Sequence, residues 1–254
     1  MGRLLRYFMV CFAAGCVLPA YADTVLYSTG FEGPAFTAGV TINGQNGWAT
    51  FGPASASQVE NSMADTGSQA LDVFPALASG QSGAYYALST SATEIEMSAD
   101  IYLASSSNQS GWQFAGFAPG LSAFVGGIDI SSTGVINLID PGNTVVTPTF
   151  TYGSWQFLDF VFNFTTQTYT FSLNGAPISS NVAFCGSDGA TCTGANVSSF
   201  GDALFDTFPA AGTPTDNGFM DNLSISSVSS VPEPRSLMLM GAGLALLIAR
   251  RLKR

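Results

Sequence analysis

The stretch WQFLDFVFNFTTQTYTFSLNG, residues 155 to 175, has the clearest alternating pattern in the sequence. Large apolar residues alternate with smaller or polar ones through both of its halves. The residues expected to face inward are Leu158, Phe160, Phe162 and Phe164, followed by Tyr169, Phe171 and Leu173. Alternation with a period of two predicts half-buried β-strands, and Asn174-Gly175 predicts a tight turn after the second strand.

The segment EIEMSADIYL, residues 94 to 103, shows the same alternation. One face would carry Ile95, Met97, Ala99, Ile101 and Leu103, and the other Glu94, Glu96, Ser98, Asp100 and Tyr102. Further strands are expected at 24–28, 69–74, 84–89, 112–117, 123–130, 134–139 and 219–227. The central chain has no convincing helical period, so the sequence predicts one all-β domain built as a two-sheet sandwich.

Positive charge is confined to the two ends of the chain. The seven basic residues are Arg3, Arg6, Arg235, Arg250, Arg251, Lys253 and Arg254, and there is no His. Of the seventeen acids only Glu233 lies outside residues 23–230, so this segment carries sixteen negative charges and no positive ones. The imbalance excludes nucleic acid as a partner. It also excludes His-dependent nucleophiles, phosphoryl transfer with an Arg clamp and His-ligated zinc, leaving carboxylate chemistry or calcium held by oxygen ligands.

The N-terminus has the layout of a secretory signal peptide. Two arginines precede an apolar stretch at 7–18, which is followed by the Ala-Tyr-Ala of residues 20–22. This order is typical of a cleaved export signal. We therefore expect a signal helix within 1–22 and a mature chain that begins at Asp23.

Cys185 and Cys192 bracket a short loop rich in Gly, Ser and Asp. In an exported protein such a pair predicts a disulfide. Closing so short a loop contributes roughly 2.5 kcal/mol in the chain-entropy model. A thiol redox site is the alternative, but residues 23–230 hold no basic group that would lower a cysteine pKa.

Residues 229–254 combine a short linker with a distinctive tail. The motif Pro232-Glu233-Pro234 is followed by an apolar run at 237–249, and the chain ends in the basic cluster Arg250, Arg251, Lys253 and Arg254. Thirteen helical residues reach about 20 Å against a hydrocarbon core of about 30 Å. We expect a short transmembrane helix whose basic end stays in the cytoplasm.

This tail resembles the PEP-CTERM sorting signal. The resemblance implies recognition by an exosortase, a transpeptidase-like membrane protease of Gram-negative bacteria that also make exopolysaccharide. Cleavage near the Pro-Glu-Pro motif would release or transfer the body to the cell exterior. The expected partners are exosortase, the secretion machinery and, transiently, the inner membrane. An ordinary tail anchor is the alternative.

Three segments resemble concanavalin A-like and laminin G-like jelly rolls. The hairpin at 152–178 opens with a Gly-x-Trp and closes with the Asn-Gly turn. FEGPAFTAGVTINGQNGW (31–48) and FMDNLSIS (219–226) resemble the first and last strands of such sandwiches. The resemblance implies an antiparallel jelly roll over residues 23–228, and an immunoglobulin-like sandwich is the alternative.

Glu94 and Glu96 resemble part of the Glu-x-Asp-x-x-Glu strand of family 16 glycosidases, which share this fold. Here the middle acid is Glu96, and the third acid, Asp100, comes one residue late. Retaining hydrolysis needs carboxyl groups about 5 Å apart, so only Glu94 with Glu96 would serve. A solvated strand face is the alternative.

The tetrapeptide Asp65-Thr66-Gly67-Ser68 matches an aspartic protease loop. That chemistry needs two such loops, and the sequence has no second copy, so we interpret the tetrapeptide as a turn.

Asp221 shares its strand parity with Phe219 and Leu223, which places it on or near the core side. Without Lys or Arg, an inward carboxylate needs backbone N–H groups or a cation. In jelly-roll carbohydrate-binding modules, an acid after the first strand and an acid opening the last strand bind a structural calcium. The resemblance places these acids at Glu32 and Asp221, with carbonyls completing the oxygen shell. Capping of the two acids by backbone is the alternative.

Aromatic residues suggest a sugar-binding platform. Tyr102 on the polar strand face and Trp112 at the start of the next strand would stack sugar rings beside Asp100. Trp48 and Trp155 are expected in the core. Ordinary half-buried aromatics of a sandwich are the alternative.

Together these features predict an exported, non-catalytic surface or matrix protein with a structural or adhesive role, including binding of polysaccharide. The alternative function is a secreted polysaccharide-degrading enzyme that uses Glu94 and Glu96.

Overall fold

The computed structural model describes residues 23–76, 80–104, 110–187, 191–209 and 216–228. Val25–Ser227 form a compact unit, close to the β domain expected at 23–228. The expected signal peptide (1–22) and the linker with the sorting tail (229–254) lie outside the described residues. Within the described ranges, no helix is long and apolar enough to cross a membrane.

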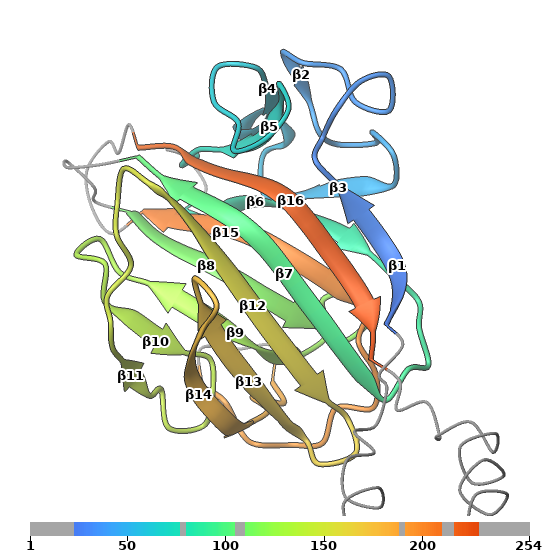
Figure 1. The fold of residues 1–254 in the computed structure, drawn as a ribbon, viewed down its shortest axis with the longest axis vertical. Coiled ribbons are helices and arrows are strands. Elements are labelled where there is room, and N and C mark those ends of the chain that lie inside the picture. The colour runs from blue at the N-terminus through green and yellow to red at the C-terminus, as the bar shows by residue number, and fades with distance from the viewer. Residues whose placement is uncertain (1–22, 77–79, 105–109, 188–190, 210–215, 229–254) are drawn as a thin grey trace, which may run out of the picture. The chain divides into compact units, whose positions relative to one another are not determined.

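Two β-sheets pack face to face, and in Figure 1 strands β7, β12 and β16 cross in front of β8 and β15. One sheet of nine strands has the order β14-β13-β12-β7-β16-β5-β4-β2, with β1 beside β16, and one of seven has the order β11-β10-β9-β8-β15-β6-β3. The architecture is the predicted all-β jelly-roll sandwich. The strands of the nine-stranded sheet are β1 (Thr24–Thr29), β2 (Val40–Thr41), β4 (Ser57–Glu60), β5 (Ala70–Val73), β7 (Glu94–Leu103), β12 (Trp155–Asn163), β13 (Thr168–Leu173), β14 (Ala176–Ala183) and β16 (Gly218–Ser227). The strands of the seven-stranded sheet are β3 (Trp48–Phe51), β6 (Ser82–Ala87), β8 (Ser110–Phe117), β9 (Phe124–Ile130), β10 (Ile136–Leu138), β11 (Val145–Val146) and β15 (Asp202–Pro209), and a 3-10 helix, η1 (Ala54–Ala56), precedes β4.

Strands β12 and β13 confirm the interpretation of residues 155–175. They pair antiparallel from Leu158 opposite Leu173 to Asn163 opposite Thr168. The side chains predicted to face inward are all buried, as are the five on the apolar face of β7. After β13 the backbone turns through positive φ angles of 52° at Asn174 and 74° at Gly175, the geometry that an Asn-Gly turn favours.

The short strands β2, β3, β4 and β11 were not predicted, and neither were the longer strands β14 and β15. The omission of β15 matters most, because β15 lies between β8 and β6 in the middle of its sheet. Successive side chains of β15 point to opposite faces of the sheet, and one of these faces carries the buried acids Asp202 and Asp206. Buried carboxylates are rare in proteins, so two acids on one face of the segment DALFDTFP do not indicate a buried central strand.

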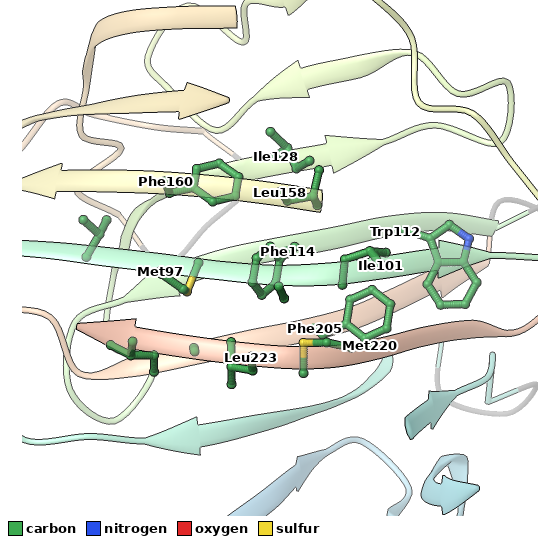
Figure 2. Packing of buried hydrophobic residues seen from close by; sticks show 14 of the residues in the cluster. Met97, Ile101, Trp112, Phe114, Ile128, Leu158, Phe160, Phe205, Met220 and Leu223 are labelled. Atoms are coloured by element: carbon green, nitrogen blue, oxygen red, sulfur yellow. The ribbon is translucent and has the colours of Figure 1, made fainter. Parts of the chain in front are cut away.

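Aromatic and aliphatic side chains of both sheets fill the space between them (Figure 2). Phe114 of β8 meets Phe160 of β12 edge-on with ring centroids 5.8 Å apart. On the same strand Trp112 stacks on Phe205 of β15, also at 5.8 Å. These contacts bury large apolar areas, and such burial is the main stabilising contribution to the sandwich.

Candidate functional site

A pocket of about 580 Å³ lies on the outer face of the seven-stranded sheet. Its floor residues, Gln113, Asp129 and Asp206, alternate along their strands with core residues such as Phe114 and Phe205. Because successive side chains of a strand point to opposite faces, the floor residues point away from the core. We call this cavity the sheet pocket.

The three floor residues form a row across adjacent strands. Asp206 of β15 lies opposite Gln113 of β8, which in turn lies opposite Asp129 of β9. Side chains directly opposite in antiparallel strands are neighbours on the same face. Register alone thus brings together residues that are far apart in the sequence.

The electrostatics of this row are unusual. Gln113 donates a hydrogen bond from Nε2 to Oδ1 of Asp129 at 2.7 Å. Burial raises the pKa of Asp206 well above its ordinary value, and the nearby Asp129 carboxylate raises it further. Burial also raises the pKa of Asp129, although the hydrogen bond from Gln113 opposes that shift. The floor therefore disfavours its own negative charge and favours a ligand that brings donors or positive charge.

The end of the disulfide loop, at Thr191 and Cys192, forms part of the pocket wall. Cys185 and Cys192 are bonded, as predicted, and Cys192 lines the pocket together with Thr191. At its first residue the loop pairs with strand β9, since the N–H of Cys185 donates a hydrogen bond to the Val125 carbonyl at 3.1 Å. The disulfide thus holds the wall against the sheet.

Apolar rings border the same cavity. Phe51, at the end of edge strand β3, is 37% exposed and lines the pocket. On another side Phe117 and Phe124 pack with ring centroids 4.0 Å apart. The pocket therefore combines exposed apolar surface with a polar floor, a combination typical of small-ligand sites.

The structure places Glu94 and Glu96 on the other sheet. Both alternate along β7 with fully buried residues and so lie on its outer face. Glu94 accepts a hydrogen bond from Nδ2 of Asn163 at 2.9 Å. Neither glutamate lines the sheet pocket.

Glu32 and Asp221 anchor one loop, residues 65–69. Oε1 of Glu32 accepts N–H bonds from Ser68 at 2.6 Å and Gln69 at 2.9 Å, and its Oε2 accepts the Ser68 hydroxyl at 2.7 Å. Oδ2 of Asp221 accepts the N–H groups of Asp65 and Thr66 at 3.0 and 3.1 Å.

These N–H and hydroxyl donors occupy most of the carboxylate lone pairs of Glu32 and Asp221 that a calcium ion would need. Oδ1 of Asp221 is also taken, by the N–H of Asn222 at 2.7 Å. Among the described residues, no group of three or more acidic, His or Cys side chains is arranged to hold a metal ion. The donor set does not fit the expected calcium site, and the two acids act as loop anchors capped by backbone.

The expected sugar platform needs correction. Trp112 is 0% exposed and lies in the core (Figure 2). It is two residues from Phe114 on β8, so both side chains point to the inner face of the sheet. Trp155, expected in the core, is instead half-buried on the outer face beside Tyr102, with ring centroids 5.6 Å apart. The two planes are inclined by 54°, so the pair offers no flat stacking surface.

Asp100 lies on this same face. Its Oδ2 accepts a hydrogen bond from Nδ2 of Asn222 at 3.0 Å. Asp100 and Tyr102 thus keep the predicted face, but without Trp112 they do not form the expected site.

The sequence analysis missed the floor of the sheet pocket. For two of the floor residues, the sequence contains an alternating pattern that predicts their position. Ile128 and Ile130 flank Asp129, and in the same way Trp112 and Phe114 flank Gln113. Alternation would have placed both polar residues on a shared outer face. Asp206 had no usable signal, since its strand was not predicted.

Comparison with known proteins concerns first the end of the chain. The family model for the PEP-CTERM protein-sorting motif matches residues 230–254. The chain carries a PEP-CTERM sorting motif. Exosortase recognises this signal, and the motif indicates export through a membrane-anchored precursor that exosortase processes. No curated protein matches the sequence.

Solved structures share the fold of the body. A sialidase is 12% identical with a TM-score of 0.56 over 82% of this chain, which spans only 18% of that protein. β-Agarase A from Zobellia galactanivorans is 11% identical, with a TM-score of 0.53 over 86% of this chain and 98% of its own. The cellulose induced protein Cip1 is 16% identical, with a TM-score of 0.52 over 79% and 97%. At these identities the likeness shows the jelly-roll fold alone.

Proposed function

We propose that the exported body binds polysaccharide in the sheet pocket and serves, without catalysis, as a structural or adhesive component of the cell surface or extracellular matrix. The PEP-CTERM motif supports delivery to the exterior. The names of the sialidase and the β-agarase support carbohydrate as the ligand class for this fold. Exopolysaccharide at the cell surface is the proposed partner.

The observation that carries this proposal is the joint presence of apolar rings and buried acceptors in one cavity. Sugar rings pack their apolar faces on aromatic side chains, which Phe51 and Phe124 supply. Sugar hydroxyl groups donate hydrogen bonds, and the floor residues Gln113 and Asp206 have buried oxygens without partners. A pocket of about 580 Å³ is large enough for part of a sugar chain.

Hydrolysis by Glu94 and Glu96 remains the second candidate function. These glutamates are separated from the sheet pocket by the thickness of the sandwich, since they lie on the outer face of the opposite sheet. A hydrolase of this kind needs its carboxyl groups on both sides of a bound sugar bond. Binding in the sheet pocket is therefore favoured.

A binding experiment with a matched pair of variants tests the proposal. The full chain, purified in detergent, is titrated with exopolysaccharide from the producing cells and followed by calorimetry. Phe51→Ala should weaken binding about tenfold, because it removes an exposed ring at the pocket. Phe157→Ala removes a ring of similar exposure (38%) on β12 of the other sheet and should leave affinity unchanged.

Two results would contradict the proposal. One is the absence of binding to the exopolysaccharide and to a panel of purified bacterial polysaccharides. The other is release of reducing ends from a bound polysaccharide that is lost on Glu94→Gln, which would assign the hydrolase function instead.

A further inference from the structure

The floor of the sheet pocket presents acceptors without donors. Both carboxylate oxygens of Asp206 and Oε1 of Gln113 are buried and have no hydrogen-bond partner. The amide nitrogen of Gln113 is already used, because it donates to Asp129. A buried acceptor without a partner costs about 1–3 kcal/mol, more when it is charged. These atoms therefore favour a ligand with several donors close together.

The charge of the surroundings narrows the class of ligand. Asp206 is 0% exposed, and Asp129 and Asp140 line the same pocket. Residues 23–230 contain no Lys, Arg or His that would offset these acids. A uronic acid or a sulfated sugar would add negative charge beside a buried carboxylate, which is strongly unfavourable. A neutral sugar would satisfy the acceptors, but only a positively charged sugar would also stabilise the ionised form of the buried carboxyl groups.

We propose that the sheet pocket selects a cationic sugar, an amino sugar with a free ammonium group in a polysaccharide chain, and seats that ammonium between Asp206 and Asp129 over Gln113. An ammonium group has three donors and no acceptor, which matches floor atoms without partners that are all acceptors. Charge-assisted hydrogen bonds of this kind are roughly twice as strong as neutral ones. This inference rests on the proposed polysaccharide-binding function and adds the chemical class of the ligand.

Three oligosaccharides that differ only at carbon 2 provide the test. Cellohexaose has a hydroxyl there, the chitin hexamer an acetamide and the chitosan hexamer an ammonium. Each is titrated into the full chain in detergent at physiological salt, which screens loose attraction to the acidic surface. The chitosan hexamer should bind at least about tenfold more tightly than cellohexaose and the chitin hexamer.

Variants separate the pocket from the general negative charge. Asp206→Asn should reduce chitosan affinity about tenfold and leave cellohexaose affinity nearly unchanged, because it removes the charge and keeps the shape. Asp129→Asn should act in the same direction. Glu60→Gln removes one charge on β4 of the other sheet and should change chitosan affinity less than twofold. Circular dichroism establishes that each variant is folded.

The outcomes distinguish this inference from the function on which it rests. Equal or tighter binding of cellohexaose would overturn the cationic ligand and leave polysaccharide binding standing. A chitosan preference that Glu60→Gln reduces as much as Asp206→Asn would also overturn it, as would Asp206-dependent binding of calcium chloride alone. If no polysaccharide binds, including the cells' own exopolysaccharide, the proposed function itself fails.

Discussion

At the scale of single residues, close packing between the sheets depends on positions that have no side chain. A Cβ atom at Gly218, the first residue of β16, would lie 2.3 Å from Cζ3 of Trp112. The indole is fully buried and stacks on Phe205, so it has little room to move aside. Gly218 is therefore required by packing against Trp112.

We expect Gly218→Ala to lower the free energy of unfolding by about 1–3 kcal/mol, the usual cost of overpacking a core. Urea denaturation followed by tryptophan fluorescence measures the loss. Gly33→Ala is the matched control, since the nearest atom to its added methyl group would be 3.7 Å away. Equal stability of Gly218→Ala and the unaltered protein would show that the Trp112 ring is not held as described.

At the scale of elements, loops are fixed to strands by carboxylates rather than by ion pairs. The loop at 65–69 is held by Glu32, which follows β1, and by Asp221 of β16. On the other sheet, Asp202 of β15 accepts a hydrogen bond from the N–H of Leu121 at 2.8 Å, and Leu121 lines the sheet pocket. With no basic side chain in the body, buried acids bind backbone N–H groups and neutral side-chain donors such as Gln113 instead.

We expect Asp221→Ala to destabilise the protein by about 2 kcal/mol, because it leaves the N–H groups of Asp65 and Thr66 without their acceptor. Thermal unfolding measures this effect, with Asp23→Ala, an exposed acid before β1, as the control. The melting temperature of the unaltered protein should not change on addition of a calcium chelator. A fall of several degrees with chelator would reinstate calcium at Glu32 and Asp221.

At the scale of the whole molecule, the exported body has only negative side-chain charges, and several of them are buried. Burial and, to a smaller extent, the Glu60 carboxylate together raise the pKa of Asp72 to about 7. Burial also raises the pKa values of Asp129 and Asp206. A carboxyl group with a raised folded-state pKa binds its proton more tightly in the folded protein, so folding is favoured at low pH.

We therefore expect the protein to become less stable as the pH rises from about 4.5 to 7.5. The contribution of Asp72 is fully present below its unfolded pKa near 4 and is lost as the pH passes about 7, on the order of 2–4 kcal/mol. Hydrogen bonds from Ser68 lower the pKa of Glu32, so the contribution of Glu32 to the stability of the protein increases as the pH rises. Urea titrations at several pH values measure the profile, and Asp72→Asn should flatten it. Stability that rises over this pH range would contradict the assignment.

The strands could be predicted where the inward face is wholly apolar, as in β7 and β12, because alternation then appears directly in the sequence. The disulfide followed from the separation of Cys185 and Cys192 and the export signal. Prediction failed for β15, where both Asp202 and Asp206 are buried, and for Trp112, whose side of the strand was assigned wrongly. The local sequence pattern shows the alternation of side chains along a strand. The strands and loops that pack against it decide which of its polar side chains are buried.

The class of the fold, the charge of the exported body and the sorting motif can all be read from the sequence, because composition and short motifs are properties of the chain alone. Which residues share the floor of the sheet pocket depends on the three-dimensional arrangement of the strands. Asp206, Gln113 and Asp129 come from three separate strands and meet because the register of β15, β8 and β9 aligns them. Such long-range pairing leaves no local trace in the sequence, since it depends on how the whole sandwich closes around its core.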